Sequence, residues 1–326
     1  MPYYWPQSCT KYALTGTPIE NRLSELWSIF DYLMPGFLYT YDQFKREIET
    51  PIAKYEDETA LARLQKMVGP LILRRLKEEV LKDLPDKLEE TRFVRLDGEQ
   101  QKLYDAQVVH MREMIAAQDE EEYNKNRIQV LAELTRLRQI CSDPSLCFEN
   151  YKDGSAKLES CVELINSAIE GGHKLLLFSQ FTSMLDILQK RLDKEGIRYY
   201  VITGATPKEK RLSMVKMFNC DETPVFLISL KAGGVGLNLT GADVVIHYDA
   251  WWNIAVQNQA TDRAHRIGQK KKVAVYKLIV KNTIEEKIQK LQETKQALAE
   301  QVIGGTGNGQ LSGMSREELL ELLEVS

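Results

Sequence analysis

The chain has 326 residues, of which 43% are hydrophobic and 28% are charged, and its formal net charge is −4. This is the composition of an ordinary globular protein, and the length suffices for two domains with a substantial core. The acidic balance argues against a surface that is basic all over, although a local groove of Lys and Arg can still bind nucleic acid.

The cysteines and histidines of the sequence do not have the spacing of a disulfide framework or a metal site. The five cysteines are scattered and include no CxxC pair, and the four histidines lie far apart. Neither a disulfide framework nor a metal site is therefore predicted. No apolar run approaches the ~18 residues of a membrane span, and the N-terminus lacks a signal-peptide pattern. We expect an intracellular protein without a membrane partner.

The first ordered segment is predicted to be a strand that ends at Gly16 and a helix that follows it. Thr17, Pro18 and Glu20 have the spacing of a capping box, and an apolar stripe continues to Phe30. Such a turn can hold a phosphate, although most strand-to-helix turns bind nothing.

Residues 38–155 are expected to be mainly helical, with long helices from Gly98 to about Tyr123 and from Asn126 to Cys141. A basic cluster at Arg74, Arg75 and Lys77 precedes them. A solvated face and a contact with DNA phosphates or another lobe both remain open for this cluster.

From Ala156 onward, short apolar runs alternate with amphipathic ones. The apolar runs cover residues 174–181, 198–204, 224–230, 243–249 and 273–280. Continuous Val, Ile and Leu runs are typical of strands buried on both faces, which predicts a parallel sheet with helices on each side. Ligands of such sheets bind beyond the carboxyl ends of the strands.

Unusual residues gather at those predicted strand ends. Glycines in a loop usually only make turns, and adjacent tryptophans are usually core. Their concentration at one sheet edge nevertheless favours a functional interpretation. The residues are Ser179, Thr203, Gly204, Ser229, Lys231, Gly233, Gly234, Gly236, Asn238, Trp251, Trp252 and Asn253.

The segment from Gln257 to Gln269 is predicted to be helical. Gln259, Arg263 and Arg266 would then share one face, at i, i+4 and i+7. Fixed arginines suit a phosphoryl group because the guanidinium fork binds two oxygens at once. The alternative is a solvated helix face with an ion pair between Asp262 and Arg266.

Two helices are predicted near the C-terminus, separated by a glycine-rich linker. The first is a long helix with an apolar stripe from Ile284 to Val302. The second is short and opens at a capping box from Ser315 to Glu318. Docking of this helix on the body of the protein and docking on a protein partner both remain open.

Six segments together resemble the SWI/SNF (Snf-two) DNA-dependent ATPases of helicase superfamily two. ALTGTPIEN is similar to motif three of that family, and LRRLKEEVLKDLP to its linker. LRQICSDPSL and SAKLE resemble the connector into the second lobe. ISLKAGGVGLNL is similar to motif five and QATDRAHRIGQ to motif six.

The resemblance implies an α/β, RecA-like parallel sheet with helices on both faces. The implied domains are the end of a first lobe (1–37), a helical linker and protrusion (38–155), a second lobe (156–281), a brace-like helix (282–303) and a tail with a short helix (304–326).

The resemblance also implies a role for each site residue. Arg263 and Arg266 would be arginine fingers that Gln259 positions, and Gly236 and Asn238 would approach the nucleotide. Thr15, Gly16 and Thr17 would couple the lobes. The DNA backbone would contact Ser179, Thr203, Gly204, Ser229, Lys231, Trp251 and Asn253.

The sequence lacks GxxxxGK[ST] and an Asp-Glu-x-His segment. ATP and Mg²⁺ are therefore expected to be bound mainly by a first lobe that this chain lacks. We expect the C-terminal motor lobe of a double-stranded-DNA translocase, inactive alone. The alternatives are a non-catalytic nucleic-acid or protein-binding module and, less favoured, a strand-separating helicase. The favoured location is the cytoplasm or nucleoid of a prokaryote, and the nucleus in a eukaryote.

Overall fold

The protein is described here from a computed structural model that covers residues 10–15, 23–55, 57–73, 75, 81, 84–233, 237–292 and 316–323. The chain divides into two compact units. One comprises residues 1–75 and 292–309, and the other residues 76–291 and 310–326.

The smaller unit is helical in its described part. Its elements are α1 (Leu23–Leu33), α2 (Tyr41–Phe44), a π-helical turn η1 (Lys45–Glu49), α3 (Thr50–Tyr55), α4 (Glu58–Val68) and a 3-10 turn η2 (Gly69–Leu71). The predicted apolar stripe is confirmed in α1, where Leu26 and Phe30 are buried against Phe44, Ile48 and Leu64.

The predicted strand before this helix is wrong for its described residues. Residues 10–15 have no strand conformation, and Leu14 is 99% exposed. A strand is stabilised by pairing with a neighbour, and within the described residues this segment has no such pairing. The predicted capping box at Thr17, and with it Gly16, lies outside the described residues.

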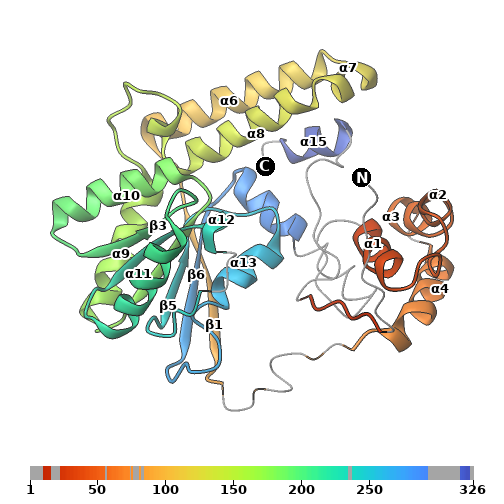
Figure 1. The fold of residues 1–326 in the computed structure, drawn as a ribbon. Helices are drawn as coiled ribbons and strands as arrows, with labels where there is room; N and C mark the ends of the chain where they lie inside the picture. The colour runs from red at the N-terminus through yellow and green to blue at the C-terminus, as the bar shows by residue number, and fades with distance from the viewer. Residues whose placement is uncertain are drawn as a thin grey trace. The chain divides into compact units, whose positions relative to one another are not determined.

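The larger unit is built on one six-stranded sheet in which every pairing is parallel (Figure 1). Its spatial order is β1-β6-β5-β2-β4-β3. The strands are β1 (Lys87–Val94), β2 (Leu175–Ser179), β3 (Tyr199–Ile202), β4 (Val225–Ser229), β5 (Val244–His247) and β6 (Val273–Val280). The predicted α/β fold with a parallel sheet is confirmed.

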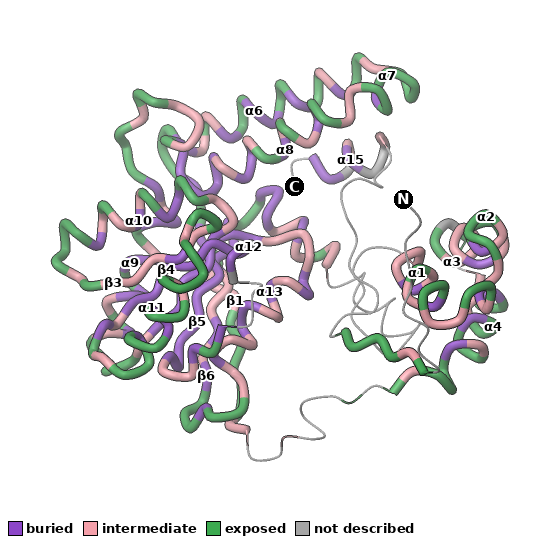
Figure 2. Tube along the Cα trace, in the orientation of Figure 1, coloured by how far each residue is buried: buried purple, intermediate pink, exposed green. Residues whose placement is uncertain are grey.

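Helices cover both faces of this sheet, as Figure 2 shows by the buried strands between partly exposed helices. Alternate strand residues such as Leu175 and Leu177 pack on α9 (Ala156–Glu170) and α10 (Thr182–Glu195). Their neighbours Leu176 and Phe178 face α11 (Lys208–Cys220) and α13 (Ile254–Thr261). Period-two alternation between two cores is what a strand buried on both faces requires.

Strand β1 was not predicted. It lies within the region 38–155, which was expected to be mainly helical. It lies at the edge of the described sheet, where β6 is its partner, and most of its residues are exposed or half-buried. Its charged sequence, KLEETRFV, therefore lacks the continuous apolar run of a central strand. Glu89 illustrates the compensation: hydrogen bonds from Lys277 and Lys87 outweigh its burial and hold its pKa at about 2.

The predicted long helices form a hairpin with a break. The elements are α6 (Gly98–Ala116), α7 (Glu120–Lys125), α8 (Arg127–Ser142) and a 3-10 turn η3 (Pro144–Leu146). The first helix ends earlier than expected because Asp119 starts α7, where its carboxylate accepts a hydrogen bond from Glu122 N.

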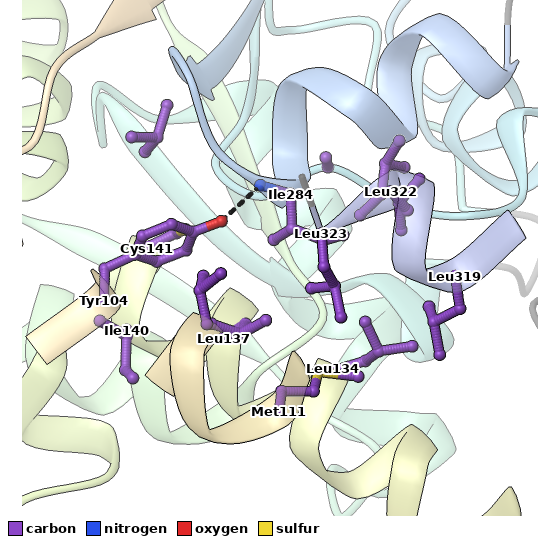
Figure 3. Close-up of a cluster of buried hydrophobic side chains, with 14 of the residues drawn as sticks. Tyr104, Met111, Leu134, Leu137, Ile140, Cys141, Ile284, Leu319, Leu322 and Leu323 are labelled. Carbon is purple, nitrogen blue, oxygen red and sulfur yellow. Dashed lines mark hydrogen bonds between the residues drawn. The ribbon is translucent and has the colours of Figure 1, made fainter. Parts of the chain in front are cut away.

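A separate apolar cluster joins this hairpin to two C-terminal helices (Figure 3). Ile284 and Ile288 come from the helix over residues 284–292, and Leu319 and Leu322 from α15 (Arg316–Leu322). They pack with buried residues of α6 and α8 such as Met111, Leu134 and Leu137. The short C-terminal helix therefore docks on the body of its own chain.

Among the described helices, none is both long and apolar enough to cross a membrane.

Candidate functional site

The arginine segment, defined as residues 262–269, follows α13 and leads toward the amino ends of the strands. His265 Nε2 bonds to Pro85 O, just before β1, and the Gln269 amide bonds to Ala242 O, just before β5. The prediction that this segment lies at the carboxyl edge of the sheet is therefore wrong. Asn253 starts this helix and accepts a hydrogen bond from Val256 N. The helix ends at Thr261, so the prediction that Gln259, Arg263 and Arg266 share one helical face is wrong. Only Gln259 is helical.

Long-range hydrogen bonding explains why the helix stops. Leu239 N donates to Arg263 O (2.9 Å), which removes that carbonyl from a helical ladder. Arg263 N and Ala264 N both bond three residues back, as in a tightened last turn. A neighbouring loop, rather than local sequence, therefore sets the path of the arginine segment.

The two arginines are nevertheless brought together. Both are half-buried, and Arg266 Nη1 donates to Leu237 O (3.1 Å). Burial lowers the pKa of Arg263, the positive charge of Arg266 lowers it further, and Asp262 opposes both effects. An anion bound beside Arg263 would favour its charged form and offset these effects.

The glycine-rich stretch leads directly into this site. Strand β4 is followed by α12 (Leu230–Gly233), and residues 234–236 lie outside the described residues, Gly236 among them. The chain resumes as residues 237–242, here called the strap. Asn219 holds the strap from α11: its amide donates to Asn238 O (2.8 Å) and accepts from Gly241 N (3.0 Å). The Asn238 side chain is exposed.

A buried histidine fastens the end of α13 to the sheet. His247 Nε2 shares a hydrogen bond with Thr261 Oγ1 (2.8 Å), and its ring stacks on Phe178. Burial lowers the pKa of His247 to about 3, so the imidazole is neutral near pH 7. A lone histidine in an apolar run carries no signal that sequence reasoning could have used.

Two candidate DNA-binding serines are buried. Ser179 and Ser229 are 1% and 3% exposed, so their hydroxyls do not line an open surface in this structure. Ser179 Oγ donates to Asp249 Oδ2 (2.5 Å), and Gln180 N donates to the same carboxylate. Burial raises the pKa of Asp249, while Arg138 and the Ser179 hydroxyl oppose the shift. Asp249 therefore ties the end of β2 to the loop after β5.

Arg138 supports that loop from the other side. It is 4% exposed, projects from α8, and one guanidinium nitrogen donates to Ala250 O. The guanidinium lies over the rings of Phe181 (5.8 Å) and Trp252 (5.5 Å). Trp251 is half-buried and packs on the opposite core. The tryptophan pair is thus partly core, and Asn253 is a helix cap.

The turn after β3 is held by an arginine. Arg211 Nη2 donates to Thr203 O (3.1 Å) and Gly204 O (3.0 Å), and its Nε donates to Thr206 O. Gly204 is exposed and Thr203 is half-buried. This turn is an accessible part of the predicted DNA track.

The remaining predicted residues have mixed outcomes. Thr15 is exposed in the smaller unit, Gly16 and Thr17 lie outside the described residues, and only the backbone of Lys231 is described, within α12. In the part of the chain that the structure describes, no three His, Cys, Asp or Glu side chains gather as a metal-binding group.

Comparison with known proteins identifies two domains in the chain. Residues 7–146 match the SNF2-related domain, and residues 156–268 match the helicase conserved C-terminal domain. The SWI2/SNF2 ATPase C-terminal domain of Sulfolobus solfataricus is 31% identical, with a TM-score of 0.60, and the match covers 74% of this chain and 100% of that one. The chain belongs to the SWI2/SNF2 ATPase family.

Other SWI2/SNF2 proteins match over nearly the whole chain. The Sulfolobus solfataricus SWI2/SNF2 ATPase core in complex with double-stranded DNA is 36% identical, with a TM-score of 0.62, over 96% of this chain and 66% of that one. The putative ATP-dependent helicase/translocase YwqA of Bacillus subtilis is 41% identical over 96% of this chain and 34% of its own. The chain spans about a third of the length of the curated relatives it matches.

Proposed function

We propose that this chain supplies the C-terminal motor lobe of an ATP-driven double-stranded-DNA translocase. The observation that carries the proposal is that Arg263 and Arg266 are both half-buried in one short segment, with Arg266 bonded to Leu237 O of the strap. In phosphoryl transfer, arginines stabilise the charge that develops on the transferred group. The substrate is ATP with its Mg²⁺, bound mainly by a lobe that carries a P-loop.

Residues near the two arginines support the same proposed role in nucleotide binding. Arg266 is bonded to the strap that continues from the glycine-rich stretch, where Gly236 and Asn238 are the proposed nucleotide contacts. Gln259 lies in the last turn of α13, one turn before Arg263. Thr15, Gly16 and Thr17 are the proposed contacts between lobes.

The proposed DNA surface lies at the carboxyl ends of β2, β3, β4 and β5. Its accessible part is the Thr203–Gly204 turn and the loop that carries Trp251 and Asn253. Lys231 is a further proposed contact. Ser179 and Ser229 support these loops from inside. The DNA complex of the Sulfolobus solfataricus core makes duplex DNA the favoured partner. Contacts of this kind go mainly to phosphates, so binding should be independent of sequence and weaken with salt.

The test is ATP turnover by a completed motor, meaning this chain supplied with a lobe that carries a P-loop and a magnesium-binding acidic pair. Turnover should rise when duplex DNA is added, and the chain alone should hydrolyse almost no ATP. DNA binding without turnover in the completed motor would instead support the non-catalytic binding module.

A further inference from the structure

The side chain of Gln269, which ends the arginine segment, is turned into the protein. It is 7% exposed. Its amide nitrogen lies 2.8 Å from Ala242 O and 3.2 Å from both Thr240 O and Ala264 O. Its amide oxygen accepts hydrogen bonds from Lys270 N and Lys271 N, each at 2.9 Å. One buried amide therefore joins the strap to the backbone of the arginine segment.

The chemistry of this position calls for a primary amide. The two N–H groups of the amide face three carbonyl oxygens, of which Ala242 O is nearest, and its oxygen accepts from two backbone N–H groups; a glutamine side chain supplies both donors and acceptor. Buried polar groups left without partners are costly, so the arrangement holds each backbone segment against the other.

The residue before it helps to turn the side chain inward. Gly268 has φ +102°, a conformation that other residues rarely adopt. A Cβ built there would lie 3.9 Å from Thr240 Cγ2, so the turn packs directly on the strap. The strap and the arginine segment thus approach each other closely where Gln269 bridges them.

Gln269 also complements the contacts made by the arginines themselves. Leu239 N bonds to Arg263 O, and Arg266 Nη1 bonds to Leu237 O. The bond from Arg266 Nη1 to Leu237 O uses the side chain that would have to reach a phosphate. Once that side chain binds a phosphate, the bond can no longer fix the backbone of Arg266. The amide of Gln269 is buried and has no such second task.

We propose that Gln269 is a positioning residue that sets the placement of Arg263 and Arg266 for phosphoryl transfer. The inference rests on the proposed function, because it assumes that the arginines act on ATP phosphates. Catalytic groups are sensitive to placement, and a shift of about 1 Å can cost roughly 10²-fold in rate.

The experiment measures kcat and KM for ATP in the completed motor with duplex DNA. The variants are Gln269→Met, Arg266→Ala and the double variant. Gln189→Met is the matched control, because the hydrogen bonds of the Gln189 amide to described residues stay within α10, to Leu185 O and Asp186 Oδ1. Gln269→Asn, which keeps the amide but shortens its reach, is a second variant in case Gln269→Met does not fold.

Gln269→Met should lower kcat about 10²-fold and leave KM for ATP within about twofold. The double variant should lie within about threefold of Arg266→Ala, because both changes remove the same interaction. Independent, multiplicative losses, or a normal kcat in both Gln269 variants, would overturn the inference. If Arg266→Ala itself keeps normal turnover, the proposed function fails instead.

Discussion

Two groups of charged side chains in the larger unit are treated in opposite ways. Lys157 on α9 and Glu285 on the helix over residues 284–292 are both fully buried, with Lys157 Nζ 2.6 Å from each carboxylate oxygen. The Glu285 carboxylate also accepts a hydrogen bond from Val280 N. Lys157 Nζ lies 5.5 Å from the centroid of the Tyr248 ring. In the arginine segment, Arg263 and Arg266 are instead only half-buried, and the charge of Arg266 adds to burial in lowering the pKa of Arg263.

Under the proposed function, the first group of charges holds the fold and the second serves a ligand. A buried ion pair satisfied on both sides is costly to break, because the remaining partner stays buried without its counterion. Half-buried like charges repel each other, which raises the energy of the site while no ligand is bound. A bound anion would be attracted to both charges and would lower that energy. The buried pair should therefore govern stability, and the arginines should govern turnover.

The largest effect on stability is expected for Lys157→Met. It leaves the Glu285 carboxylate buried without its partner, which should lower the free energy of unfolding by about 3–5 kcal/mol. Urea denaturation of the chain measures this, with Lys190→Met on the exposed face of α10 as the control. A loss no larger than that of the control would mean that the pair does not hold the fold.

The next effect is a pH dependence from His247, which bonds to Thr261 at the end of α13. Its pKa is about 3 in the folded chain against 6.5 in the unfolded chain. The unfolded state therefore binds the proton first as pH falls, so the stability from neutral His247 is present above about 6.5 and is lost toward about 3.

This loss should amount to about 2 kcal/mol between pH 7 and pH 5. His247→Gln keeps a partner for Thr261 and does not titrate, so its free energy of unfolding should fall less over the same interval. Parallel pH profiles of the two proteins would contradict the assignment.

The smallest expected effect concerns the start of α13. Asn253→Ala removes the side chain that accepts Val256 N and should lower the free energy of unfolding by about 1 kcal/mol. Asn253→Ser, which can still cap the helix, should be nearly neutral. If both variants lose the same stability, the cap is not the reason.

Sequence patterns predicted five of the six strands, including the edge strand β3, and missed the other edge strand, β1. β2, β4 and β5 are continuous apolar runs because both of their faces are buried. β1 escaped prediction because an edge strand keeps charged residues such as Glu89 and Arg92.

The site was predicted in composition but not in geometry. Motif similarity pointed to Arg263 and Arg266, yet the end of α13 depends on Leu239, which bonds to Arg263 O from a distant loop. The supporting residues Asp249, His247 and Gln269 are single polar side chains, and their roles arise only from contacts with distant segments.

The most direct test of the account is one variant measured in two ways. Arg266→Ala should lower DNA-stimulated ATP turnover of the completed motor by about 10³-fold or more. The same change should alter the free energy of unfolding of the chain by less than about 1 kcal/mol, because Arg266 is only half-buried. Near-normal turnover, or a loss of stability as large as that expected for Lys157→Met, would contradict the claim that the arginines serve the nucleotide rather than the fold.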